Sequence, residues 1–189
     1  MDFALPYTEE QERFRQEVRA WLAENVDEDM KEPIDPEMDF TDELGAYWRE
    51  KYREIAAKGW LYPAFPTEYG GGGLGLVETS IVLEEVNRSG GNANAVHAQV
   101  YMMGVLLRHA SEWLKRTYLP QIASGSLRLQ AFAVTEPEAG SETTRIETSA
   151  VHKGDKYVIN GSKIFTSRVL QSDMMLVLAR TTPYDDLEN

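Results

Sequence analysis

The sequence contains no cysteine. This absence excludes disulfide bonds, thiolate nucleophiles and zinc sites with thiolate ligands. Histidine is also rare, and the three present, His97, His109 and His152, are scattered along the chain without the spacing of a metal-ligand set. We interpret each as a surface or helix residue, and we expect no metal site.

Basic residues are few. The chain has 19 Lys and Arg against 31 Asp and Glu, which gives a formal net charge of −12. A general nucleic-acid binder needs a basic surface that neutralises phosphates, so this class is excluded. The charge still allows one phosphorylated small molecule to be held by backbone N–H groups.

Long hydrophobic runs are missing as well. No apolar run reaches the roughly 18 residues that span a bilayer. The first residues, "MDFALPYTEEQERF", become acidic and polar at once, unlike a signal peptide. With 42% apolar and 26% charged residues the chain has a globular composition. We expect no membrane partner and, by default, a cytoplasmic location.

Helical patterns occupy the first two thirds of the chain. The first helix is predicted to begin with a capping box formed by Thr8 and Gln11. An acidic, proline-containing stretch from Asp27 to Asp42 is interpreted as a solvated connector. Four further helices are predicted, over Asp42–Lys58, Leu76–Arg88, Asn92–His109 and Ser111–Ala123.

From Leu127 the period changes to that of strands. The stretches "LRLQAFAV", "RIETSAVHK" and "DMMLVLAR" each predict a strand, with a turn at "KGDK". "YVINGSKIF" predicts two short strands around Asn160–Gly161. The predicted fold class is therefore α+β, with a helical domain over residues 1–125 and an incomplete antiparallel β domain over 126–189.

The predicted β domain has little to cover it. Four or five strands in about 60 residues form a sheet with open edges, and the chain then ends in the polar "TTPYDDLEN". We expect residues following Asn189, or another chain, to complete this domain.

The stretch "AFAVTEPEAGSETTRI", residues 131–146, is the strongest candidate for a binding site. Pro137 ends the apolar run, and Gly140 permits close approach of a ligand. Hydroxyls and backbone N–H groups of Ser141, Thr143 and Thr144 are able to donate to phosphate oxygens. Two interpretations are open: a β-turn whose hydroxyls satisfy the local backbone, or a cradle for a nucleotide pyrophosphate.

Two other motifs have plainer interpretations. "GGGG", Gly70–Gly73, follows no strand and precedes no Lys-Ser/Thr pair, so it is not a phosphate loop and is interpreted as a flexible connector. The apolar residues Met102–Leu107 are interpreted as helix core, with an acyl pocket as the alternative.

Taken together, the motifs resemble the acyl-CoA dehydrogenase family of flavoproteins. The matching stretches are "FPTEYGGGGLG", "LEEVNRSGG", "YLPQIASG", "AVTEPEAGSE" and "TSAVHKGDKYVINGSKIFTS". Their order and spacing agree over nearly the whole chain. The combination of TEP-x-AGS with NG-x-K-I-F-T-S about 20 residues later is specific, whereas "AGS" alone would not be.

The resemblance implies an N-terminal helical domain, a middle β domain and a C-terminal helical domain, the last absent from this chain. FAD would lie between the β domain and the C-terminal helices. Val134 and Thr135 would meet the flavin ring, Ser141 its pyrophosphate, and Phe165 would stack on the flavin. The implied FAD-contacting residues are Phe132, Val134, Thr135, Gly140, Ser141, Phe165, Thr166 and Ser167. The implied substrate-contacting residues are Ser141, Val96 and Tyr101.

Three residues depart from the family pattern. Glu138 replaces a small residue, and its charge would be unfavourable near a diphosphate. Glu142 stands where aspartate is usual. Phe165 stands where a tryptophan is usual, which keeps an aromatic face but loses area and an indole N–H. These changes leave flavin binding possible.

The implied activity is oxidation of an acyl-CoA to its trans-2-enoyl-CoA within fatty acid metabolism. A glutamate would take the α-proton and flavin N5 the β-hydride, with electrons passing to an electron-transfer flavoprotein. No residue here matches that glutamate, and the positions of Glu136, Glu138 and Glu142 beside the flavin loop do not suit the role. The family also implies a homo-oligomer, a tetramer. Alternatives are a flavin oxidase or monooxygenase of the same fold, or a catalytically silent helical interaction module.

Overall fold

The computed structural model describes residues 7–31, 41–91 and 94–183, without the side chains of residues 94–101. The chain divides into two units, Met1–Leu127 and Arg128–Asn189. Unit 1 is helical and unit 2 contains the strands, so the expected order of a helical region followed by a small β region is confirmed.

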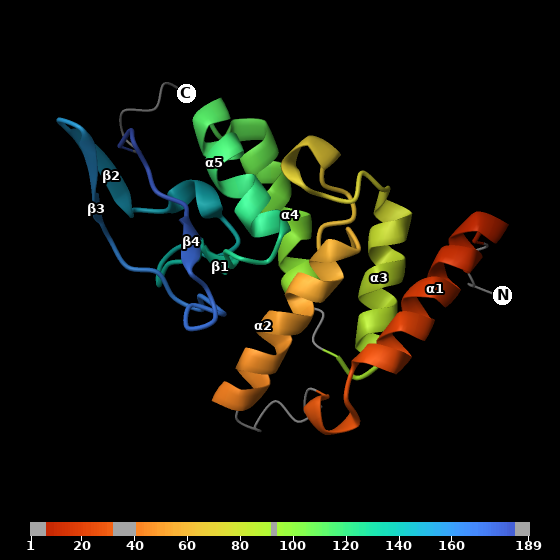
Figure 1. Ribbon diagram of the computed structural model, residues 1–189. Helices are drawn as coiled ribbons and strands as arrows, with labels where there is room; N and C mark the ends of the chain where they lie inside the picture. The colour runs from red at the N-terminus through yellow and green to blue at the C-terminus, as the bar shows by residue number, and fades with distance from the viewer. Residues whose placement is uncertain (1–6, 32–40, 92–93, 184–189) are drawn as a thin grey trace, which may run out of the picture. The chain divides into compact units, whose positions relative to one another are not determined.

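Unit 1 contains the five predicted helices, with bounds close to those expected (Figure 1). They are α1 (Glu9–Asn25), α2 (Asp42–Ala57), α3 (Leu76–Arg88), α4 (Asn94–His109) and α5 (Glu112–Ala123). Short 3-10 turns, η1 (Glu28–Met30) and η2 (Thr67–Tyr69), lie in two of the connections. Within the described residues, none of these helices is long and apolar enough to cross a membrane.

Hydroxyl caps begin three of these helices. At α1 the predicted capping box is present, because Gln11 N donates to Thr8 Oγ1 at 3.2 Å and Thr8 N donates to Gln11 Oε1 at 3.1 Å. Thr41 caps α2 and Ser111 caps α5 in the same way, each accepting a backbone N–H bond at 3.2 Å. The caps satisfy donors that have no partner inside the helix.

The inner face of α2 follows the sequence pattern. Leu44, Trp48, Tyr52 and Ile55 are buried, as their helical spacing predicts. The Trp48 indole N–H donates to the Met30 carbonyl at 3.0 Å, which ties α2 to the turn after α1. Gly59, which follows the end of this helix, has φ +74°, a conformation that commonly ends helices.

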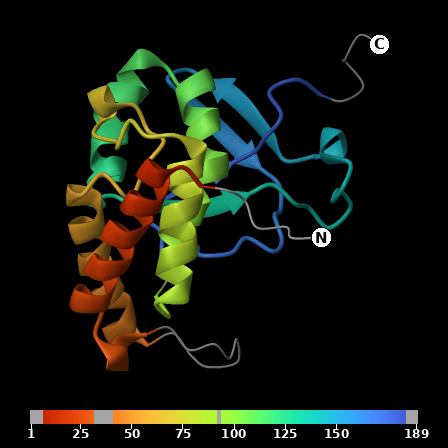
Figure 2. The ribbon, with the colours of Figure 1, turned by 90° about the vertical axis from the view of Figure 1, so that its right-hand side faces the viewer.

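Helices α1 and α3 run parallel and pack side by side (Figures 1 and 2). Between them Glu85 is 1% exposed, and the Arg19 guanidinium donates to both of its carboxylate oxygens at 2.8 Å. The hydrogen bond from Arg19 lowers the pKa of Glu85, although partial burial opposes this. Glu85 of the "LEEVNRSGG" motif therefore holds α3 against α1.

The glycine run was expected to be a flexible connector, and this is wrong. A Cβ on Gly71 would lie 2.0 Å from the Phe65 Cβ, and one on Gly72 would lie 2.5 Å from the Gly59 carbonyl oxygen. Backbone bonds from Gly71 to Pro66 and from Gly72 to Tyr62 hold the loop in place. The glycines are needed because other chain segments pass too close for a side chain.

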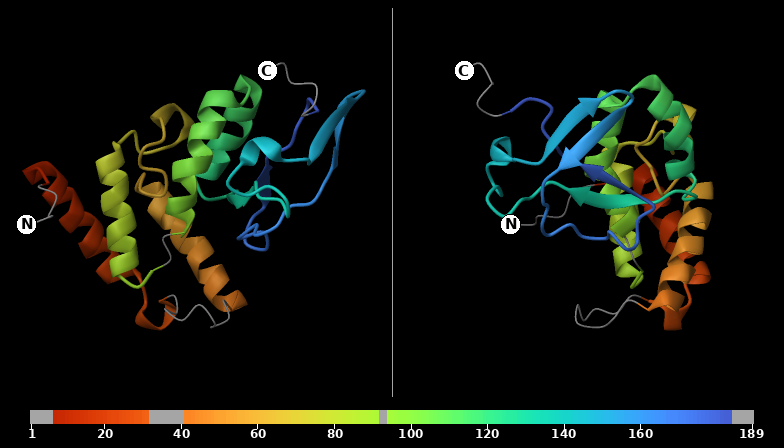
Figure 3. Two further views of the ribbon diagram at one scale, coloured as in Figure 1. Left: turned by 180° about the vertical axis from the view of Figure 1, so that it is seen from behind. Right: turned by 90° about the vertical axis from the view of Figure 1, so that its left-hand side faces the viewer.

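The described residues of unit 2, 128–183, form four strands in two pairs, which Figure 3 shows. They are β1 (Leu129–Ala133), β2 (Ser149–Lys153), β3 (Lys156–Asn160) and β4 (Met174–Val177), with the 3-10 turn η3 (Thr143–Arg145). β2 and β3 form the antiparallel hairpin that "KGDK" predicts, with Gly154 at φ +66° in its turn.

The pairing of β1 with β4 differs from the expected antiparallel arrangement of the β domain. These strands are parallel, with Phe132 opposite Leu176 and Ala133 opposite Val177. The connection between them carries the whole β2–β3 hairpin, and parallel strands require a long connection of this kind.

The stretch "YVINGSKIF" also differs from the prediction, because it contains one strand, β3, which ends before Gly161, and residues 161–165 form none. At Gly161 a Cβ would lie 2.3 Å from Thr148 Oγ1 and 2.6 Å from the Thr148 Cα, so only glycine fits. The next residues are held by contacts with the exit of β1, described below, and not by a sheet ladder.

Candidate functional site

The exit of β1 forms a tight turn. Glu136 N donates to the Ala139 carbonyl at 3.0 Å, and Ala139 N donates to the Glu136 carbonyl at 3.2 Å. Pro137 and Glu138 lie at the exposed tip of this turn. The turn interpretation of the "TEPEAGSE" motif is therefore correct for residues 136–139.

The residues after this turn behave differently. Gly140 and Ser141 are exposed, as are Thr143 and Thr144. Among the described residues, no hydrogen bond involves the hydroxyls of Ser141, Thr143 or Thr144, although the Thr144 carbonyl accepts a bond from Arg180. These hydroxyls do not satisfy the local backbone and are free to meet a ligand.

Neither the backbone conformation nor the packing of the described residues requires a glycine at position 140. It is absent from the glycines with positive φ, and a Cβ built on it would meet no described atom within 4 Å. Its small size would matter only if something else approached the backbone here.

Glu136 is a buried carboxylate, 6% exposed, at the centre of this part of unit 2. It accepts hydrogen bonds from Lys163 Nζ at 2.7 Å, Glu147 N at 2.6 Å and Thr148 N at 3.0 Å. Burial opposes its ionisation, but the bond from Lys163 and the bonds from Thr148 and Glu147 outweigh it and lower the pKa of Glu136 to about 2. A group that binds protons so weakly is unsuited to act as a general base.

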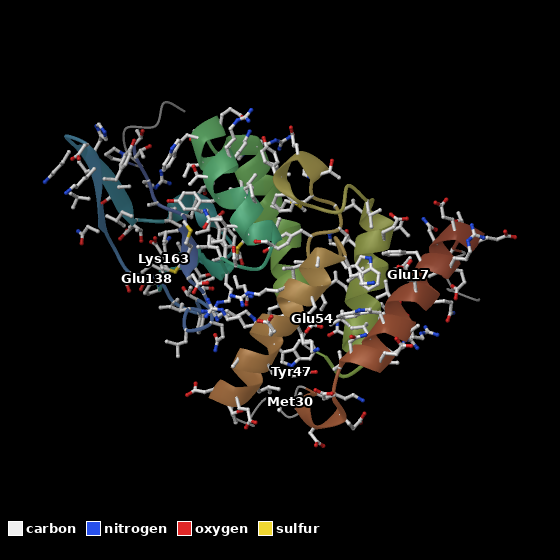
Figure 4. The ribbon with its side chains drawn as sticks, viewed as in Figure 1. Glu17, Met30, Tyr47, Glu54, Glu138 and Lys163 are labelled. Atoms are coloured by element: carbon white, nitrogen blue, oxygen red, sulfur yellow. The ribbon has the colours of Figure 1, made fainter. Side chains whose placement is uncertain are left out.

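Lys163, labelled in Figure 4, joins this carboxylate to the strand exit. Its ammonium also donates to the Val134 carbonyl at 2.8 Å, and Ile164 N donates to the Thr135 carbonyl at 2.9 Å. These contacts place the segment at residues 163–164 against residues 134–136. The predicted flavin neighbours Val134 and Thr135 therefore lie on a segment that is bonded to the one carrying Phe165.

Phe165 is unusual in two respects. Its side chain is 86% exposed, and its φ is +56°, as strained as that of Arg168 at +61°. The left-handed region costs a residue with a side chain about 1–2 kcal/mol. A strained backbone that presents a large apolar ring to solvent is expected where the ring meets a ligand. Thr166, half-buried, and Ser167, exposed, follow directly.

The remaining predicted residues lie in β1, in the segment after its turn and on α4. Phe132 is half-buried in β1. No hydrogen bond or ion pair given for the described residues joins Gly140 or Ser141 to the 163–167 segment. Val96 and Tyr101 lie on α4, where the side chains are outside the described residues.

The pair formed by Glu136 and Lys163 was missed by the sequence analysis. Both residues were in the quoted motifs, but Glu136 was considered only as a candidate base and Lys163 was not considered. The available signal was a pair of opposite charges. Glu136 stands shortly after an apolar run and Lys163 directly before two apolar residues, in segments that the flavin was expected to bring together.

A helical unit followed by a small β unit is the domain order that the resemblance to acyl-CoA dehydrogenases implies. The family models agree: the acyl-CoA dehydrogenase N-terminal domain matches residues 8–126 and the acyl-CoA dehydrogenase middle domain matches residues 131–188. The chain belongs to the acyl-CoA dehydrogenase family, which confirms the resemblance.

Individual relatives give the same result. The chain is 33% identical over 176 residues to mitochondrial isovaleryl-CoA dehydrogenase of Bos taurus, covering 92% of this chain and 39% of the relative. It is 35% identical over 177 residues to cyclohex-1-ene-1-carbonyl-CoA dehydrogenase of Syntrophus aciditrophicus (strain SB), covering 93% and 41%. The chain thus spans about 40% of the length of these relatives.

A solved structure is also similar. The ChsE4-ChsE5 complex from Mycobacterium tuberculosis contains a chain that matches with a TM-score of 0.80 and 27% identity. The match covers 98% of this chain and 46% of that chain. The likeness therefore extends over both units.

Proposed function

We propose that this chain supplies the flavin site and part of the acyl-CoA site of an FAD-dependent acyl-CoA dehydrogenase. The observation that carries the proposal is the exposed, strained Phe165, bonded through its neighbours to Val134 and Thr135. We assign residues 1–125 to the N-terminal helical domain and 126–189 to part of the middle β domain.

The residues present fit FAD. Phe165 offers an apolar face for a ring system, and Thr166 and Ser167 offer polar groups beside it. Gly140 leaves space for a diphosphate to approach the backbone, and the Ser141 hydroxyl is free to donate to it. Glu138, the charge expected to be unfavourable, is exposed at the tip of the turn.

In the proposed reaction an acyl-CoA thioester is converted to its trans-2-enoyl-CoA. When bound, FAD supplies the hydride acceptor for the β-carbon. Ser141 and the α4 positions Val96 and Tyr101 contact the substrate, and the residues of this chain orient the reactants and exclude water. We place the base for the α-proton outside these 189 residues, since no residue here matches the family's glutamate, and Glu136 is buried and bound to Lys163.

The proposed partners follow from the family. We infer an electron-transfer flavoprotein as the physiological acceptor and a homo-oligomer, a tetramer, as the assembly. Both are proposals for the whole protein.

The test uses the protein encoded by the complete reading frame that contains these residues. Purified with FAD, it is expected to lose its visible flavin absorbance when an acyl-CoA is added without oxygen, and to recover it with an artificial electron acceptor. A purified protein that binds no FAD would contradict the proposal. Rapid reoxidation of the reduced flavin by oxygen would instead favour an oxidase or monooxygenase.

A further inference from the structure

Three segments of unit 2 that are far apart in sequence meet at one ion pair. We propose that Glu136 and Lys163 are positioning residues that hold the Val134–Thr135 segment and the Phe165 segment in register, so that FAD affinity depends on this pair. The inference rests on the proposed function, because it concerns the same flavin site, but it assigns a role to two residues that do not themselves need to touch the flavin.

The geometry shows that each charged group does more than bind its partner. Lys163 Nζ donates to Glu136 Oε1 at 2.7 Å and also to the Val134 carbonyl at 2.8 Å. Glu136 accepts from Glu147 N at 2.6 Å and from Thr148 N at 3.0 Å. Removing either side chain therefore leaves backbone groups of another segment unpaired.

The pair is shielded from water, since the side chains are 9% exposed at Lys163 and 7% exposed at Glu136. A shielded pair is little screened by salt and has few alternative geometries. It is also the point where residues 147–148, which lead into β2, join the two predicted flavin segments. The pair thus links the hairpin to the candidate site.

Consecutive carbonyls at the strand exit are fixed by this arrangement. The Val134 carbonyl accepts from Lys163, and the Thr135 carbonyl accepts from Ile164 N at 2.9 Å. With both carbonyls bonded, the peptide planes on either side of Thr135 have little freedom to rotate. Phe165 follows Ile164 directly, so its left-handed backbone begins from a residue that is held in place. A flavin ring that contacts both segments requires their spacing to be constant.

A neutral replacement is not equivalent at either position. Glutamine at 136 has one acceptor oxygen, and its amide group would point donors at the donors of Lys163, Glu147 or Thr148. Methionine at 163 fills the space of the lysine stem but bonds neither Val134 nor Glu136. Arginine at 163 keeps the charge and the donors.

The experiment compares FAD binding by the complete protein and five variants. Lys163→Met and Glu136→Gln remove the pair. Lys156→Met and Asp155→Asn are the controls, because they remove one charge of each sign at exposed positions of unit 2 outside the candidate site. FAD dissociation constants and the visible circular dichroism of bound FAD at saturation are measured, with far-UV circular dichroism as the check on folding.

We expect FAD to bind about tenfold or more weakly to Lys163→Met and Glu136→Gln, and within about twofold of wild type to both controls. At saturating FAD, the visible circular dichroism of the two pair variants should differ from wild type, a change that reduced stability alone would not produce. Lys163→Arg, which is the safer variant for folding, should bind FAD more tightly than Lys163→Met.

Two results are distinguishable. If wild type binds FAD and Lys163→Met has wild-type affinity and an unchanged visible spectrum, or Lys163→Arg binds no better than Lys163→Met, the positioning role is overturned and the proposed function stands. If wild type itself binds no FAD, the proposed function is overturned and the positioning role with it.

Discussion

Phe165 combines a large apolar ring, 86% exposure and a left-handed backbone. The ring therefore contributes little to the packing of the described residues, while its backbone conformation costs free energy. A substitution at this position can therefore weaken FAD binding while it raises the free energy of unfolding of the FAD-free protein.

We predict that Phe165→Gly raises the free energy of unfolding of the FAD-free protein by about 1 kcal/mol, since glycine adopts positive φ without strain. The same variant should bind FAD more weakly, as should Phe165→Ala, whereas Phe165→Trp should bind it. Urea unfolding and FAD titration make the comparison. If Phe165→Gly binds FAD as wild type does, the ring does not contact the flavin.

At Gly140 and Ser141 the prediction concerns affinity alone. A charged oxygen accepts a hydroxyl bond worth about 1.5–3 kcal/mol, so Ser141→Ala should weaken FAD or acyl-CoA binding by about tenfold or more. Gly140→Val should abolish FAD binding by blocking the backbone. Because a Cβ at position 140 would meet no described atom within 4 Å and Ser141 is exposed, both variants should unfold like wild type. Unchanged affinity in both would leave only a turn at this motif.

Glu136 should make stability depend on pH. Its pKa falls from an ordinary value of 4.5 to about 2 in the folded protein. The stabilisation is therefore fully present above pH 4.5 and is lost as the pH falls toward 2, for a total of about 3 kcal/mol.

Thermal unfolding between pH 5 and pH 2 checks this. Wild type and Glu138→Gln should lose stability together as the pH falls, whereas Glu136→Gln should show a smaller loss. Parallel curves for Glu136→Gln and wild type would mean that Glu136 is not held as a bonded carboxylate.

Among the elements, the loop at Gly70–Gly73 carries the clearest test. Gly71→Ala should destabilise unit 1 by about 1–3 kcal/mol, because the added methyl would overlap the Phe65 Cβ, 2.0 Å away. Gly104→Ala, in α4 with open space around it, is the control and should be neutral or stabilising by up to about 1 kcal/mol. Far-UV circular dichroism during thermal unfolding distinguishes them. A Gly71→Ala variant as stable as wild type would support the interpretation of this loop as a flexible connector.

Helices were predictable because their signals are local. The Thr8, Thr41 and Ser111 caps and the spacing of buried residues in α2 lie within a few residues of the element that they specify. The glycine loop was not predictable, since its close contacts come from Gly59 and Phe65, which are outside the run. The same holds for the parallel pairing of β1 with β4, which joins residues 44 or 45 positions apart.

The candidate site shows a similar division. The motifs identified Gly140, Ser141 and Phe165 as candidate site residues. They did not predict that these residues are exposed, because exposure depends on which residues the rest of the folded chain covers. The pair of Glu136 and Lys163 connects residues 27 positions apart, and no local pattern indicates which carboxylate a lysine will meet.

In the molecule as a whole, unit 2 leaves apolar residues of its β2–β3 hairpin uncovered. Tyr157, Val158 and Ile159 of β3 and Val151 of β2 remain largely exposed, each by 47% or more. The relatives are more than twice as long as this chain. The 189 residues alone should therefore show no acyl-CoA oxidation with an artificial electron acceptor. Sustained turnover by this chain in isolation would place the base within it.

The central claim is that these residues form a flavin site, and the FAD content of the purified complete protein tests it most directly. After free flavin is removed, the visible absorbance should show FAD bound in stoichiometric amount in wild type and absent from Gly140→Val. The far-UV circular dichroism of the two proteins should be the same. A folded wild-type protein without bound FAD, or equal FAD content in both proteins, would contradict the account.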